Sequence, residues 1–289
     1  MKLFSLLVSL SGAVGAAELL TASPFSNDAA VSRIPSSYES AVMGRRILAL
    51  SKLGELSTVF PDAGSREDEA DHVLEYRPGG LGGVPIGLMD YVADCEDEGN
   101  PTVLAIKIAT AFKNVEAGSN LTLSMRWTPP YPPSRRISFM SRLAAHIPFL
   151  SGATGESPYN LAPHSTGPAT PDPVPYSAAN LPRFSLIGYL EPIKTDDDPA
   201  TAVRLATCFT AKHHDAKWWL PGNPIHKSEW ARLVVTHVYW IGGFGDRAYI
   251  GWIPVDEWKS VTKEEWSGIK LPGEKKGWSE WSVNAVDEL

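Results

Sequence analysis

The sequence predicts a mainly β protein, an antiparallel β-barrel with flanking helices and a long proline-rich insertion. Strand-like segments dominate the pattern, number about seven and are mostly joined by short turns. Such turns favour antiparallel pairing, because parallel strands need long crossover connections. The prolines are uneven, since 12 of the 24 lie in residues 128–183. With 43% hydrophobic residues, the chain can form a real core.

The first 17 residues have the pattern of a signal peptide. Lys2 is followed by an apolar run over residues 3–14, and then by small residues before Glu18. The run is too short to span a bilayer, which needs about 20 apolar residues. An N-terminal anchor helix is the alternative. Residues 18–36 are small, polar and proline-containing, which predicts a flexible mature N-terminus.

The first half of the barrel begins with a helix over residues 37–53, with Ser37 as its N-cap and Gly54 as its end. Residues 61–72 are charged and predict an exposed loop, and residues 79–83 predict a glycine-rich turn. Strands are predicted over residues 55–60, 84–92, 102–110 and 121–127.

Residues 128–183 cannot form a regular helix or a central strand, because proline removes backbone donors. We interpret the segment as an insertion between two barrel strands. A linker between two domains is the alternative, but neither flanking half has enough strands to close a sheet.

The second half continues with a helix for which Asp198 is the expected N-cap, with Pro199 at its first position. Helical segments are predicted over residues 199–214 and 255–261, and strands over residues 183–193, 231–241 and 247–253. The predicted domain is therefore residues 37–258, followed by a tail over residues 259–289.

Charge and processing signals limit the partners and the compartment. The net charge of −7 argues against a nucleic-acid partner, and no later segment is apolar enough for membrane insertion after signal cleavage. Asn120 begins a usable N-glycosylation sequon. Cys95 and Cys208 could form one disulfide in an oxidising compartment, but the sequence leaves their pairing open.

Three short motifs suggest functions that their context argues against. Residues 243–248 fit G-x-G-x-x-A, but the next residues predict a strand instead of the helix that a dinucleotide site needs. Residues 278–282 match the WSxWS box of cytokine receptors without the cysteine framework of those receptors. His213, His214 and Asp215 lie too close in sequence to converge on one metal ion.

The sequence contains no nucleophile elbow, P-loop, H-E-x-x-H or zinc-type cysteine pairing. We therefore predict no catalytic residue and no metal site.

Several segments resemble the CREG family. Residues 204–219 are similar to the family's helix and the histidine–tryptophan corner that follows it, although Asp215 and Ala216 stand where the family commonly has proline. Residues 239–245 resemble the family strand ending YWIGGFG, and residues 38–58 resemble the opening of flavin-type split barrels. The resemblance covers residues 38–127 and 183–258. Its motif residues are His213, Trp218, Tyr239, Trp240, Gly242, Gly243, Phe244 and Gly245.

This resemblance implies a split β-barrel like that of pyridoxamine 5′-phosphate oxidase, usually a homodimer with a ligand cleft between the subunits. Some members of that superfamily bind FMN and related proteins handle haem, whereas CREG-type members are secreted or endolysosomal glycoproteins without clear catalysis. We therefore expect a non-catalytic secretory-pathway protein that binds an unknown protein or small molecule. An FMN-dependent oxidoreductase is the alternative, and a cytokine-receptor-like binding module is a third hypothesis.

A flavin site would need cations for the phosphate and hydrogen-bonding groups for the ring. Lys107 and Lys113 flank a predicted strand and could hold the phosphate, and Ser57 and Thr58 could bond a ring edge. No arginine-rich phosphate grip is evident in the sequence, so we expect no tightly bound cofactor, with FMN as the open alternative.

The chain ends in Asp287-Glu288-Leu289, which resembles the signals for retrieval to the endoplasmic reticulum. Val286 stands where such signals have Lys or His, so secretion or an endolysosomal or vacuolar destination is an equal alternative.

Overall fold

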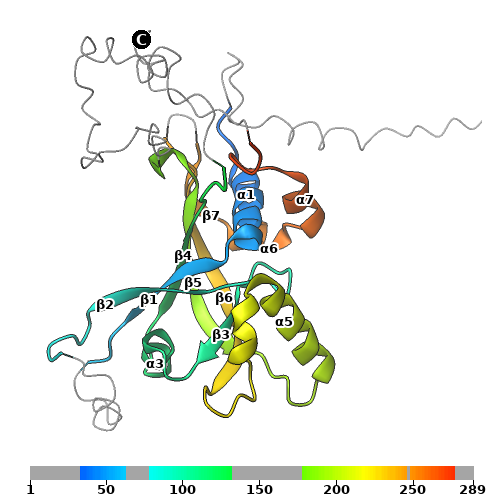
Figure 1. Ribbon diagram of the computed structural model, residues 1–289. Helices are drawn as coiled ribbons and strands as arrows, with labels where there is room; N and C mark the ends of the chain where they lie inside the picture. Colours follow the sequence, from blue (N-terminus) through cyan, green and yellow to red (C-terminus); the bar gives the residue numbers. More distant parts are fainter. Residues whose placement is uncertain (1–32, 63–77, 132–177, 246–247, 277–289) are drawn as a thin grey trace, which may run out of the picture. The chain divides into compact units, whose positions relative to one another are not determined.

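The computed structural model describes residues 33–62, 78–131, 178–245 and 248–276 (Figure 1). The predicted signal peptide, most of the proline-rich insertion, the WSxWS box and the terminal Asp-Glu-Leu lie outside these residues. Arg33–Thr128 and Ser177–Gly268 form one compact unit, which contains the whole sheet. The described residues of a second unit include Tyr131, whose backbone N–H donates to Gly273 O and whose ring lies under the Lys276 ammonium.

Seven antiparallel strands form one open sheet, in agreement with the predicted split barrel. The strand order is β2-β1-β4-β5-β6-β3, and β7 pairs with β6. Both β3 and β7 pair with β6, β3 with its first residues and β7 with its last. The strands are β1 (Leu53–Val59), β2 (Pro85–Tyr91), β3 (Thr102–Ile106), β4 (Leu121–Arg126), β5 (Arg183–Pro192), β6 (Ser228–Ile241) and β7 (Ile250–Ile253).

Strands β1 and β4, the first half of β5 and most of β6 bury every second residue, as expected of a sheet with one face on a core. In β1, Gly54, Leu56 and Thr58 are buried and the residues between them are not. The same alternation in the neighbouring strands supplies the main core residues, which are Leu56, Leu121, Leu123, Phe184, Leu186, Val238 and Trp240.

Helices α1 (Ser37–Leu50) and α6 (Val255–Ser260) pack on this core. The Phe184 ring lies 5.6 Å from Trp240 and 5.6 Å from Trp258 of α6, between centroids. Gly44 of α1 allows this packing, since a Cβ there would lie 2.6 Å from the Trp258 ring.

The N-terminus of α1 differs from the prediction. Ser36, not Ser37, is the N-cap, because its side chain accepts the Glu39 N–H while the Glu39 carboxylate accepts the Ser36 N–H. The helix also ends before the predicted residue, because Leu53 and Gly54 pair with β2 as part of β1.

The other helices agree with the prediction in part. Helix α5 (Pro199–Lys212) has Asp198 as its N-cap, as predicted. The predicted strand 102–110 is wrong after Ile106, because Thr110–Glu116 form helix α3. Helix α7 (Lys263–Gly268) lies in the segment predicted as a tail. Two 3₁₀ helices are also present: η1 (Ala178–Asn180) precedes β5, and η2 (His214–Trp218) follows α5.

A β-bulge between β5 and β6 bends the centre of the sheet. Ile187 pairs with His237 and Gly188 pairs with Val235, so Thr236 is the extra residue. A Cβ on Gly188 would lie 1.9 Å from Val234 O, so the two backbones approach closely only because residue 188 is glycine. Among the described residues, no helix combines the length and the apolar character that a membrane span requires.

Candidate functional site

The face of the sheet opposite the core carries the candidate site. We call it the outer face. None of its side chains is fully buried. It comprises Glu55 and Ser57 of β1, Thr122, Ser124 and Arg126 of β4, Arg183, Ser185 and Ile187 of β5, His237, Tyr239 and Ile241 of β6, and Ile250 and Trp252 of β7.

The middle row of the outer face crosses five strands in register. In order, its residues are Glu55, Ser124, Ser185, Tyr239 and Trp252. The Ser124 and Ser185 hydroxyls share a hydrogen bond of 2.9 Å, and the Tyr239 and Trp252 rings meet edge-on at 5.1 Å between centroids. The row therefore has two hydroxyls at its centre and two aromatic side chains at one end.

The neighbouring row extends the same pattern. It consists of Ser57, Thr122, Ile187 and His237. The His237 ring lies 6.2 Å from Trp252, edge-on, so Trp252 contacts aromatic rings from both rows. Trp252 is nevertheless 56% exposed, which is unusual for so large an apolar side chain. The outer face thus has aromatic rings at one end and short hydroxyls beside them, and both could contact a flat ligand.

Two of the four residues predicted for a flavin site, Ser57 and Thr58, lie on opposite faces of the sheet. Ser57 lies on the outer face, whereas Thr58 is buried on the opposite face, where its hydroxyl accepts a hydrogen bond from the Asn114 amide at 3.0 Å. Adjacent residues of a strand point to opposite faces, so the two cannot bond the same ring edge. Lys113 precedes Asn114 on α3, and Lys107 is exposed just after β3.

Asn120 of the sequon is exposed and directly precedes β4. Its neighbour Ser119 accepts the Val59 N–H at 2.7 Å, which fixes this corner beside the end of β1. The Asn120 side chain is thus placed where an oligosaccharide can be attached without unfolding.

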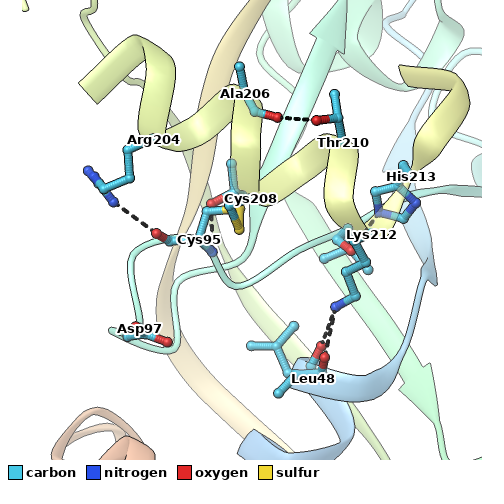
Figure 2. Close-up of a disulfide and its surroundings, with 12 residues drawn as sticks. Leu48, Cys95, Asp97, Arg204, Ala206, Cys208, Thr210, Lys212 and His213 are labelled. Atoms are coloured by element: carbon cyan, nitrogen blue, oxygen red, sulfur yellow. Dashed lines mark hydrogen bonds between the residues drawn. A yellow bond between two sulfur atoms is a disulfide. The ribbon is translucent and has the colours of Figure 1, made fainter. Parts of the chain in front are cut away.

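A second polar region lies where α5 meets the chain after β2 (Figure 2). We call it the disulfide anchor, formed by Asp94, Cys95, Arg204, Cys208, Lys212 and His213. Cys95 and Cys208 form a disulfide, which decides the pairing that the sequence left open. The Arg204 guanidinium donates to Cys95 O at 2.8 Å, so helix and loop are joined twice.

Lys212 connects the end of α5 to the end of α1. Its ammonium donates to Leu48 O at 3.0 Å and to Ala49 O at 3.1 Å (Figure 2). A cation at the carbonyl end of a helix interacts favourably with the negative end of the helix dipole. Burial lowers the pKa of Lys212 to about 8, although the nearby Asp94 carboxylate acts in the opposite direction.

His213, a motif residue of the family, is buried. Its imidazole bonds Val92 O at 3.0 Å, stacks on Tyr91 at 4.6 Å and contacts Phe209 at 4.8 Å. Burial lowers its pKa, so the neutral form is favoured. Within the described ranges, no three His, Cys, Asp or Glu side chains group together as metal ligands would. The bond to Val92 O and the ring contacts with Tyr91 and Phe209 give His213 a packing role.

Asp94 of the anchor forms a buried ion pair with Arg45 of α1, at 3.2 Å. The guanidinium also donates to Trp258 O, Val261 O and Asp97 O. Burial raises the pKa of Asp94, and the Arg45 charge offsets part of that rise. Such a pair joins helices and loops at the cost of removing two charges from water.

The YWIGGFG segment serves both faces of the sheet. Tyr239 belongs to the outer face, whereas Trp240 is fully buried in the core. Gly242 is required because a Cβ there would lie 2.8 Å from Trp240 Nε1, and Gly243 has a φ of 152°, which favours glycine. Phe244 is partly exposed, Gly245 is exposed, and Trp218 of the other motif is 64% exposed. The motif glycines thus form a turn, as predicted.

Sequence reasoning missed Ser124, Ser185 and Trp252 as site residues. The alternation of buried and open positions in β4 and β5 could have indicated the two serines, since each lies between apolar residues. Nothing local to the sequence indicates that the two hydroxyls meet.

The profile of the CREG β-barrel family matches residues 35–260. The comparison with curated proteins gives no match. Among solved structures, the chain is similar to a heme binding protein from Mycobacterium smegmatis, with 15% identity and a TM-score of 0.45, over 80% of this chain and 62% of that one. It therefore spans less than two thirds of that protein's length.

Two other solved structures are similar over most of their own length. One is a FAD-binding protein from Mesorhizobium loti, with 11% identity and a TM-score of 0.35, over 71% of this chain and 94% of that one. The other is general stress protein 26 from Bacillus anthracis, with 11% identity and a TM-score of 0.34, over 70% of this chain and 92% of that one.

Proposed function

This chain belongs to the CREG β-barrel family, and we propose that it is a secretory-pathway glycoprotein that binds a flat ligand on the outer face of its sheet without catalysing a reaction. The observation that carries the proposal is the middle row. Its two central positions hold the short hydroxyls of Ser124 and Ser185, and its end holds the exposed rings of Tyr239 and Trp252. Exposed aromatic rings beside hydrogen-bonding groups are typical of ligand-binding surfaces.

Two further features support the secretory pathway. A disulfide joins Cys95 and Cys208, and disulfides persist in oxidising compartments. Asn120 is exposed within a sequon, and the first 17 residues have the pattern of a signal peptide. Expression in eukaryotic cells tests this part. We expect the secreted or lumenal protein to lose mass on N-glycanase treatment, and Asn120→Gln to abolish that loss. An unprocessed N-terminus with free thiols would overturn it.

Retrieval through Asp287-Glu288-Leu289 and assembly as a homodimer belong to the same proposal. Deleting the three terminal residues should move the protein from the endoplasmic reticulum to the medium if they act as a retrieval signal. An unchanged distribution would exclude the retrieval signal, and secretion or an endolysosomal destination would then remain. Light scattering of the purified protein tests the dimer, and a mass near that of one glycosylated chain would contradict it.

Ligand binding is tested by titrating the purified protein with riboflavin, FMN and hemin, and following its tryptophan fluorescence. We expect at least one of these flat probes to bind, and Trp252→Ala to weaken that binding at least tenfold. The matched control is Trp218→Ala, which removes a similarly exposed indole from η2 and should leave binding unchanged. Failure of all three probes to bind would overturn the outer-face proposal.

An FMN-dependent oxidoreductase is the second candidate. It is favoured by Ser57, which lies on the outer face at the β1 end of the row next to the middle row and could bond the edge of a flavin ring. A flavin absorbance spectrum in the purified protein, with bleaching on addition of a reductant and recovery in air, would support this candidate. Binding of flavin without such turnover would contradict the oxidoreductase and agree with a non-catalytic binding protein.

A further inference from the structure

We propose that Arg126 and Arg183 form an anion subsite on the outer face, which binds the phosphate of a ligand whose aromatic ring lies over Tyr239 and Trp252. This inference rests on the proposed function, because it names the chemical class of ligand for the same face. It also differs from the prediction of Lys107 and Lys113 as the phosphate site.

The two arginines face each other across a strand pair. Arg126 is the last residue of β4, Arg183 is the first residue of β5, and the register pairs them directly. The next pair along the same face is Ser124 with Ser185. Two guanidinium groups and two hydroxyls are therefore adjacent on one patch.

This arrangement has an energetic cost that a bound anion would remove. Like charges directly opposite on antiparallel strands destabilise a sheet. Within the described part of the chain, neither arginine forms an ion pair. Glu55 is the nearest acidic residue of the outer face, but its carboxylate lies over Gly87 of β2, away from β4. Among the described residues, the positive charge of the pair thus has no acidic partner on this face.

The chemistry of the patch suits a phosphate monoester. A guanidinium binds phosphate oxygens through two parallel N–H groups, so two facing arginines can hold one dianion between them. Arg183 is partly positioned already, since it donates to Ala179 O at 3.4 Å. In the Ser124–Ser185 pair, one hydroxyl donates to the other, and the accepting hydroxyl keeps its own hydrogen for the ligand.

The position of the rings sets the length of the ligand. Neighbouring strands lie about 4.8 Å apart and successive residues on one face of a strand lie about 6.8 Å apart, so Trp252 on β7 is about 12 Å from the Arg183 position on β5, which is one row away. A phosphate attached directly to a ring is too short to reach both. The subsite therefore favours an aromatic ring that carries its phosphate on a spacer, as nucleoside and flavin monophosphates do. Ile241 and Ile250 complete the arginine row and offer the spacer an apolar surface.

The experiment compares FMN with riboflavin, which has the same ring and spacer without the phosphate, and AMP with adenosine as a second pair. Affinities are measured on the full glycosylated chain by fluorescence titration and calorimetry, with inorganic phosphate as a competitor. The variants are Arg126→Gln/Arg183→Gln for the proposed subsite and Lys107→Gln/Lys113→Gln for the rival position. Lys217→Gln/Lys259→Gln, which removes two exposed charges from η2 and α6, is the control.

We expect at least one phosphorylated probe to bind about tenfold or more tightly than its unphosphorylated partner, since a charged hydrogen bond contributes this much. The arginine variant should abolish that ratio without weakening the unphosphorylated probe, and both lysine variants should keep it. A ratio near one in the wild type, or a ratio lost only in Lys107→Gln/Lys113→Gln, would overturn the subsite while ring binding persists. If no probe of either kind binds, the proposed function fails and the subsite fails with it.

Discussion

The outer face and the disulfide anchor are both rich in polar side chains, but the two regions use them differently. In the disulfide anchor, Arg204, Lys212 and His213 each bond a backbone carbonyl of another segment. On the outer face, Arg183 donates to Ala179 O, but neither Arg126 nor Arg183 forms an ion pair within the described residues, and the Tyr239 and Trp252 rings remain partly open to solvent. The comparison indicates that the anchor stabilises the fold, whereas the outer face keeps its groups available for a ligand.

The largest expected loss of stability comes from breaking the buried ion pair between Arg45 and Asp94 of the anchor. Arg45→Met leaves Asp94 buried without its partner, so we expect a loss of about 3–5 kcal/mol in the free energy of unfolding at neutral pH. Chemical denaturation measures the loss, which should shrink at acidic pH because protonated Asp94 carries no charge. The control is Arg33→Met, which breaks an exposed pair with Glu39 and should cost less than about 1 kcal/mol. Equal losses in both variants would contradict the assignment.

The disulfide comes next. Cys95→Ser/Cys208→Ser removes a crosslink between residues 113 apart in sequence, and we expect a loss of about 2–5 kcal/mol. Denaturation with and without dithiothreitol measures it. Reduced wild-type protein should match the double variant, and the variant should be insensitive to the reductant. Wild-type protein that keeps its full stability after verified reduction would show that the anchor holds without the bond.

A smaller effect is expected from the titration of Lys212. Its pKa falls from 10.5 to about 8 on folding, so between these values the unfolded state holds a proton that the folded state has released. The stability of the wild type should therefore rise with pH in this window, relative to Lys212→Met. Lys259→Met is the control and should keep the wild-type rise. Parallel pH profiles for wild type and Lys212→Met would rule out the lowered pKa.

The smallest effect on stability is expected on the outer face. Ser124→Ala/Ser185→Ala should change the free energy of unfolding by less than about 0.5 kcal/mol, because both hydroxyls lie on the open face. The same variant should weaken a phosphorylated probe severalfold. Ser260→Ala, on α6, is the control for both measurements. A loss of stability above about 2 kcal/mol would mean that the serine pair supports the sheet, as the anchor groups do.

Parts of the fold could be predicted from local sequence. Seven strands were expected and seven are present among the described residues, because runs rich in β-branched, apolar and aromatic residues mark most of them. Helix α3 was missed because Ala109 offers no side-chain cap and the segment follows a strand without a turn signal. The N-cap of α1 was misplaced by one residue, because Ser36 and Ser37 are both good caps and only the bond to Glu39 N distinguishes them.

The candidate site was predictable only in part. Tyr239 is a residue of the family motif and Ser57 was predicted as a ring-edge donor, and both lie on the outer face. Thr58 was grouped with Ser57 by proximity in sequence, but the pleat of β1 turns it into the core.

By itself, the sequence determined the alternation that gives the sheet a buried face and an open face, the glycine turn after Trp240 and the family to which the barrel belongs. Only the tertiary structure decided that Arg126 faces Arg183 and that Cys95 reaches Cys208. The physical reason is that alternation and turns arise from neighbouring residues, whereas register depends on contacts between distant segments. A shift of one residue in the β4–β5 register would separate the arginines while leaving the composition of each strand unchanged.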